Sequence, residues 1–155
     1  MDTSVTIIGL VITALIGIPL FFMFRAHRAN HSKVKAIFAR FGNFDFQLSD
    51  TQNKKVLAID EKNKGFVFID FNSQPEDVHF VNLNDVSSVK AVPTTESHSS
   101  NVVKIEFEFQ FKQNQKKQNI PFYTIERDQI GQVYLYEDQQ LSKKWEALIS
   151  QNISA

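Results

Sequence analysis

Residues 5–24, VTIIGLVITALIGIPLFFMF, form an unbroken apolar run without a charged side chain. A helix rises about 1.5 Å per residue, so a run of this length spans about 30 Å, the thickness of the hydrocarbon core of a bilayer. A cleaved signal peptide is the alternative, but it would have a basic start, a shorter apolar run and small residues at a cleavage site. The sequence therefore predicts a retained transmembrane anchor over residues 1–24.

The segment that follows this run is basic and holds no acidic residue. Over residues 25–41 the net charge is +5, from Arg25, Arg28, Lys33, Lys35 and Arg40. Because basic residues flank the cytoplasmic end of membrane helices, the pattern predicts that Met1 lies outside and the rest of the chain in the cytoplasm. The inverted topology, with an outward-facing domain, is the alternative.

Small side chains follow one face of the predicted membrane helix. Gly9, Thr13 and Gly17 stand at i, i+4 and i+8. Such a strip lets a second helix approach closely, so these three residues are candidate helix-packing positions for a membrane-protein partner or a second copy of the chain. The alternative is that lipid covers them, since Gly is frequent in membrane helices.

Residues 25–42 are expected to form a basic helix or linker beside the membrane. Each Lys or Arg near an anionic surface adds about 1 kcal/mol of attraction. The candidate contacts with lipid head groups are Arg25, Arg28, Lys33 and Lys35. Apolar residues recur at helical spacing within residues 34–41, and the alternative is that this stripe packs on the domain that follows.

From residue 43 the apolar period changes from helical to alternating, which is typical of strands. Residues 104–112, KIEFEFQFK, are the clearest case, because Phe107 and Phe109 share one face, expected in the core, and glutamates occupy the other. Pro121 indicates an edge strand, and Gly65 is expected to take a positive φ in a turn. A polar loop is expected over residues 93–101. The other predicted strands are residues 44–49, 55–60, 66–71, 78–83, 86–92 and 118–125.

The period becomes helical again near the C-terminus. Leu141, Trp145, Leu148 and Ile149 stand at i, i+4, i+7 and i+8, which predicts an amphipathic helix over residues 136–153 with Trp145 as its largest buried side chain. Residues 43–155 are therefore expected to form an α+β, mainly β domain of about seven antiparallel strands capped by a C-terminal helix.

This arrangement resembles the pleckstrin-homology-like (PH-like) superfold over residues 44–151, through the strand count, the segment LNDVSSVKAV and the helix with Trp145. It is also similar to small bacterial membrane proteins that attach such a domain to transmembrane helices. The resemblance implies a PH-like domain on the cytoplasmic face of the bacterial inner membrane. Members that bind phosphoinositides concentrate basic residues around the first hairpin. Here that region holds acidic residues as well, so a solvated face is expected for Lys54, Lys55, Lys62 and Lys64.

No pattern in the chain predicts catalysis. The chain has no cysteine, which excludes thiolate chemistry and disulfides, and it has no phosphate-binding loop or metalloprotease motif. Residues 42–155 carry a net charge of −4, which disfavours binding to nucleic acid. We therefore expect no enzyme activity, catalytic residue, metal or cofactor.

The expected function is that of a membrane-anchored interaction module. Its expected partners are membrane lipids and either a membrane protein or a second copy of the chain. The first hypothesis is an accessory or scaffolding subunit of an inner-membrane complex. The alternative is a lipid- or small-ligand-binding domain held at the membrane face.

Overall fold

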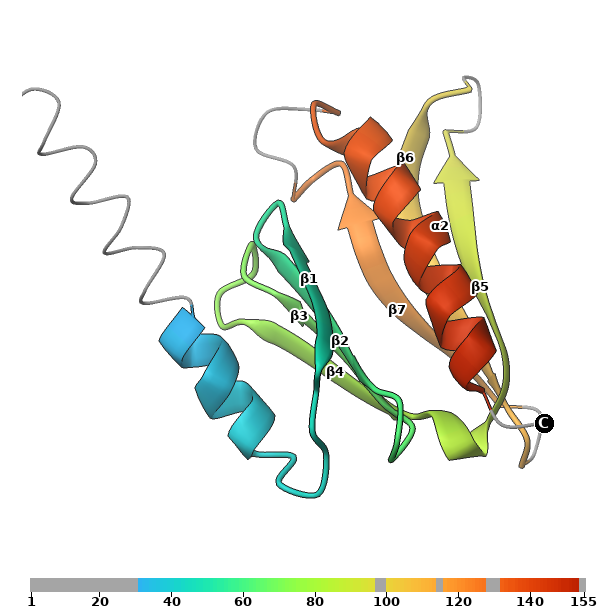
Figure 1. The fold of residues 1–155 in the computed structure, drawn as a ribbon. Coiled ribbons are helices and arrows are strands. Elements are labelled where there is room, and N and C mark those ends of the chain that lie inside the picture. Colours follow the sequence, from blue (N-terminus) through green and yellow to red (C-terminus); the bar gives the residue numbers. More distant parts are fainter. Residues whose placement is uncertain (1–30, 97–99, 114–115, 128–131, 154–155) are drawn as a thin grey trace, which may run out of the picture. The chain divides into compact units, whose positions relative to one another are not determined.

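The computed structural model describes residues 31–96, 100–113, 116–127 and 132–153 (Figure 1). The chain divides into two compact units, Met1–Gly42 and Asn43–Ala155. The boundary between them falls where the apolar period of the sequence changes from helical to alternating.

In the first unit, residues 31–39 form a helix that ends in a turn. Lys33 and Lys35 are exposed and Ile37 is buried, so basic and apolar residues lie on different faces, as the helical period predicts. The predicted anchor over residues 1–24 lies outside the described residues. In the part of the chain that the structure describes, no helix combines the length and apolarity needed to cross a bilayer.

The first sheet of the second unit is an antiparallel meander in the order β1-β2-β3-β4. Every residue of β2 and β3 is buried, because both strands are central and their sequences, KVLAID and GFVFID, are apolar almost throughout. Leu57 pairs with Phe68 on the face that lines the core. The strands are β1 (Leu48–Gln52), β2 (Lys55–Asp60), β3 (Gly65–Asp70) and β4 (Asp77–Asn82).

A short 3₁₀ helix, η1 (Leu83–Asp85), leads from this sheet into a second antiparallel meander, β5-β6-β7. On the central strand β6, Phe107 and Phe109 are fully buried, and Glu108 on the opposite face pairs with Lys117. The predicted alternation of this strand is therefore confirmed. The strands are β5 (Val86–Thr95), β6 (Val102–Phe111) and β7 (Lys117–Thr124).

Helix α2 (Leu135–Asn152) lies along the second sheet and packs against all three of its strands (Figure 1). Trp145 on α2 is fully buried, and its ring centroid lies 6.0 Å from that of Phe66 on β3. Its indole nitrogen donates a 2.8 Å hydrogen bond to Asp50 Oδ2 on β1. One face of each sheet and one face of α2 thus form a single core. The predicted mainly β domain, with seven antiparallel strands and a C-terminal helix, is confirmed.

The expected strand over residues 44–49 is wrong in its first four residues, because residues 44–47 have no regular structure and β1 begins at Leu48. Phe44 packs on Phe80, with ring centroids 4.8 Å apart, and lies over Gly65. A Cβ at Gly65 would come within 2.3 Å of Phe44 Cδ1. The positive φ of this turn, 59°, falls on Lys64, so Gly65 serves the close approach of a ring rather than the turn itself.

The two prolines in the second sheet both lie in edge strands. β5 continues through Pro93 to Thr95, which shortens the loop expected from residue 93, because an edge strand tolerates a residue without a backbone N–H. Pro121 lies in the other edge strand, β7, as predicted. The register shifts between Pro121 and Tyr123, which makes Phe122 the extra residue of a bulge.

Candidate functional site

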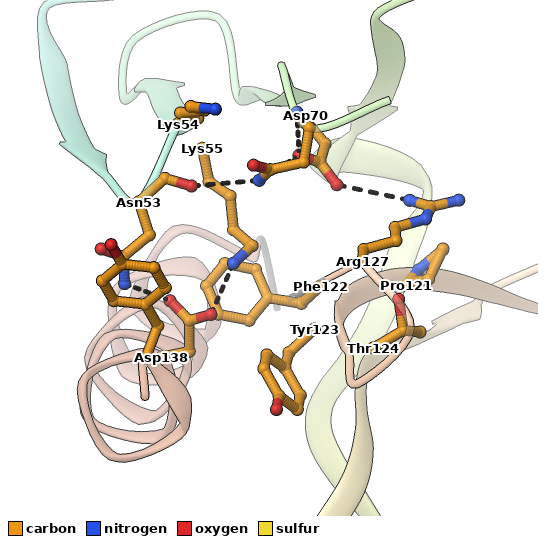
Figure 2. A pocket seen from close by; sticks show the side chains of 12 residues that line it. Asn53, Lys54, Lys55, Asp70, Pro121, Phe122, Tyr123, Thr124, Arg127 and Asp138 are labelled. Carbon is orange, nitrogen blue, oxygen red and sulfur yellow. Dashed lines mark hydrogen bonds and ion pairs between the residues drawn. The ribbon is translucent and has the colours of Figure 1, made fainter. Parts of the chain in front are cut away.

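A cavity of about 230 Å³ opens where the turn after β1, the end of β3, strand β7 and the start of α2 converge (Figure 2). We call it the Lys55 pocket. Its lining brings together side chains from residue 53 to residue 138, so it exists only in the folded domain. Figure 2 shows two ion pairs, Lys55 with Asp138 and Arg127 with Asp70, on either side of the rings of Phe122 and Tyr123.

The turn between β1 and β2 positions Lys55. Gln52 pairs with Lys55 across a two-residue connection, and both Asn53 (φ 50°) and Lys54 (φ 60°) have positive φ. Such a turn matches the twist of a hairpin, and Asn tolerates the left-handed conformation well. The turn leaves Lys54 exposed and buries Lys55. The expectation that Lys55 belongs to a solvated face is therefore wrong.

Lys55 and Asp138 form a buried ion pair, with side chains 8% and 0% exposed. Lys55 Nζ donates to Asp138 Oδ2, and Asn53 Nδ2 donates to Asp138 Oδ1 at 3.1 Å. The ammonium also lies 5.4 Å from the ring centroid of Phe122 and 5.8 Å from that of Tyr123. The carboxylate and the two aromatic faces together replace the water that this cation loses on burial.

The second ion pair joins Asp70, which is buried at the end of β3, to Arg127, which follows β7. Arg127 Nη1 lies 3.3 Å from Asp70 Oδ2 and 3.6 Å from Asp77 Oδ2. Asp70 Oδ1 also accepts hydrogen bonds from the backbone and side chain of Asn72. The arginine side chain is 39% exposed. Its guanidinium thus holds a buried carboxylate on one side and remains open to solvent.

Thr124, the last residue of β7, is one of the residues that line the pocket. Thr124 Oγ1 is buried and has no hydrogen-bond partner among the described residues. Buried hydroxyls are nearly always paired in native proteins, since leaving one unpaired costs about 1–3 kcal/mol. The unpaired hydroxyl of this lining residue is therefore a candidate ligand contact.

Asp60, whose pKa is lowered, lies away from the pocket at the end of β2, beside the turn that leads to β3. Burial alone would raise the pKa of Asp60, but hydrogen bonds donated by the backbone of Asn63, Asp45 and Lys62 and by the Asn63 side chain outweigh it and lower the pKa below its ordinary 3.8. Asp45 N, 2.7 Å from Asp60 Oδ2, ties the segment before β1 to this turn. The Asp60 carboxylate is thus a hydrogen-bond acceptor that stabilises the local structure.

None of the residues predicted to pack in the membrane, to contact head groups or to form the core lines the Lys55 pocket, whereas Lys54 and Lys55, which were expected on a solvated face, do. Gly9, Thr13, Gly17, Arg25 and Arg28 lie outside the described residues. Lys33 and Lys35 lie on the helix of the first unit and are exposed. The core candidates Trp145, Phe107 and Phe109 are fully buried.

Sequence reasoning assigned no binding role to four of the polar residues that line the pocket: Lys55, Asp138, Arg127 and Thr124. For two of these residues, the sequence pattern could have indicated a buried charge. Lys55 opens the otherwise apolar run KVLAID, and Asp138 stands three residues before Leu141 and seven before Trp145, on the face of α2 that is buried. A charged residue on a buried face requires a partner.

No protein-family model matches this sequence, and comparisons with curated proteins and with solved structures find no similar protein. Among the described residues, no group of three or more His, Asp or Glu side chains is placed to hold a metal ion.

Proposed function

We propose that this chain is a membrane-anchored binding module, in which a PH-like domain accepts a ligand or a partner's side chain in the Lys55 pocket. The order of the elements supports the PH-like part of the proposal. A four-stranded meander is followed by a three-stranded meander and then by one helix that closes the core. A fold of this kind hosts many functions, so the binding role is argued from the pocket.

The observation that carries the proposal is the convergence of two ion pairs, an unpaired hydroxyl and aromatic rings on one cavity. Burying a charged pair contributes little stability compared with apolar residues of similar volume. Ligand sites are typically hollows with apolar walls and a few convergent polar groups. The polar groups of the Lys55 pocket are therefore better explained by recognition than by stability.

The proposed location of the domain is the cytoplasmic face of the bacterial inner membrane. The apolar run over residues 5–24 and the basic residues after it support this assignment. The exposed Lys33 and Lys35 would contact lipid head groups together with Arg25 and Arg28. A cysteine introduced at Thr3 should react with an impermeant reagent on intact cells. Labelling only after lysis would refute this topology.

A second candidate function is an accessory or scaffolding subunit of a membrane complex. Two exposed apolar side chains favour it: Val133 (58% exposed) in the turn before α2 and Tyr136 (71%) in its first turn. They flank Tyr134, which lines the pocket. Adjacent exposed apolar side chains are common at protein contacts. In this version Gly9, Thr13 and Gly17 would pack against the membrane helix of the partner or of a second copy.

One experiment separates these versions. The tagged full-length chain is extracted gently in detergent, and mass spectrometry identifies the proteins and small molecules that co-elute with it. An Arg127→Gln chain tests the pocket, and Lys117→Gln, which removes a surface ion pair, is the matched control. A companion lost only from Arg127→Gln supports binding in the pocket. Identical companions on all three chains would contradict it.

A further inference from the structure

The Lys55 pocket has a net positive charge in a domain whose net charge is negative. Its lining contains Lys54, Lys55 and Arg127 against Asp70 and Asp138, a surplus of one positive charge. Residues 42–155 as a whole carry −4. A hollow with a local positive surplus concentrates anions rather than cations. The surplus of one positive charge matches a monoanion. A dianion would be repelled more strongly by the two carboxylates of the lining.

Three donors remain available to such an anion. Among the described residues, Arg127 forms its ion pairs through Nη1 alone, although a guanidinium presents five N–H groups in a planar fork. The ammonium of Lys54 is on an exposed residue. Thr124 Oγ1 is the third, and it has no partner among the described residues. A planar carboxylate fits the arginine fork in a bidentate manner.

Besides the amides of Asn53 and Asn72, the rest of the lining is aromatic or apolar. Phe122, Tyr123, Tyr134 and Pro121 contribute to it. The volume of about 230 Å³ exceeds the roughly 150 Å³ of a cavity that holds benzene, so it accommodates one substituted ring. Flat aromatic walls favour a flat ligand, since rings stack with an offset or edge to face.

We infer that the Lys55 pocket binds a planar aromatic monocarboxylate, with the carboxylate on Arg127 and Thr124 and the ring against the side chains of β7 and Tyr134. This inference rests on the proposed binding function and names its ligand class. The carboxylate belongs either to a free small molecule or to the C-terminal aromatic residue of a peptide.

Titration of the full-length chain in detergent tests the ligand class, with heat of binding as the readout. The probes are benzoate, phenyl phosphate and benzyl alcohol, which share the ring and differ in charge. Benzoate should bind most tightly. Equal or tighter binding of phenyl phosphate or benzyl alcohol, or no binding of benzoate, would overturn the inference. A Gly-Gly-Phe peptide with a free or an amidated C-terminus distinguishes the two sources of the carboxylate. If the free-acid peptide binds more tightly than benzoate, the ligand is the C-terminal end of a peptide. If benzoate binds more tightly, the ligand is a small molecule.

Two variants test the contacts. Arg127→Lys keeps the charge beside Asp70 but removes the planar fork of N–H donors. It should lower the affinity for benzoate about tenfold, the effect of one charge-assisted hydrogen bond. Thr124→Val keeps the shape of the side chain and should lower the affinity for benzoate about threefold. It should also raise the melting temperature of the ligand-free chain, because an unpaired buried hydroxyl is removed. Lys117→Gln should change neither. Unchanged benzoate affinity in both pocket variants would refute the assignment.

The two proposals fail in distinguishable ways. If Arg127→Gln loses a native companion but benzoate does not bind, the pocket is a binding site and the ligand class is wrong. If the companions are unchanged and benzoate does not bind, the binding function itself is refuted.

Discussion

Replacing Lys55 by methionine tests the buried ion pair most directly. Methionine retains an unbranched apolar stem against the rings of Phe122 and Tyr123 but removes the ammonium. Asp138, whose side chain is 0% exposed, would then keep Asn53 Nδ2, at 3.1 Å, as a donor. The carboxylate would have to stay charged in the interior without its cationic partner or take up a proton, and either change lowers the free energy of unfolding.

The expected size follows from these contacts. Breaking a buried ion pair by removing one partner costs about 3–5 kcal/mol. The hydrogen bond from Asn53 remains, which favours the lower end, whereas the loss of the two cation–π contacts adds about 1 kcal/mol. We therefore expect Lys55→Met to lose about 3–4 kcal/mol, which for a domain of this size lowers the melting temperature on the order of 10–20 °C.

Thermal unfolding of the full-length chain in detergent, followed by circular dichroism, measures the loss. Lys55→Met with Asp138→Leu should recover most of the stability, because the uncompensated charge is removed as well. Lys117→Met is the control, since it breaks an exposed pair (58% and 29%) and should cost at most about 1 kcal/mol. A loss in Lys55→Met no larger than in this control would refute the reasoning, as would a double variant less stable than Lys55→Met.

Three further substitutions test the packing of the domain outside the pocket. Trp145→Ala should cost about 3–5 kcal/mol, because it empties a fully buried site and removes the donor to Asp50; an unchanged melting temperature would contradict this. The pKa of Asp60 is lowered in the folded chain, so its contribution to stability is present above the unfolded pKa of about 4 and is lost as pH falls through the lower folded value. Asp60→Asn should therefore melt lower at pH 7 and lose less stability on acidification than the parent chain, in melts recorded against pH; parallel acid profiles would argue against this. Gly65→Ala should cost about 1–3 kcal/mol by displacing Phe44, and Phe44→Ala in the same chain should relieve the clash; equal instability of the single and double variants would exclude the ring contact as the cause.

Local patterns in the sequence predicted the elements of the domain. KIEFEFQFK alternates because β6 has one face in the core, and Trp145 recurs with Leu141 and Ile149 because α2 buries one stripe. Both patterns depend only on neighbours along the chain. Phe44 also alternates with Phe46, but it packs as a ring over Gly65 rather than in a strand, so the same pattern had a different cause there.

The pocket was not predictable in the same way. Lys55 lies 83 residues before its partner Asp138, and Arg127 lies 57 residues after Asp70. A pattern of neighbours carries no information about which distant side chains meet. The burial of Lys55 follows from a turn with two positive φ values, and the position of Thr124 follows a bulge in an edge strand. These features depend on tertiary packing, which one sequence does not reveal.

The way in which α2 joins the two sheets has a consequence for folding during synthesis. Each strand pairs with its neighbour in sequence, so the hairpins can form as the chain leaves the ribosome. The links from Asp50 to Trp145 and from Lys55 to Asp138 span 95 and 83 residues. They form only after the last helix has emerged. Until then the apolar residues of both sheets that pack against α2 stay uncovered, and exposed apolar surface makes a partly folded chain prone to aggregation.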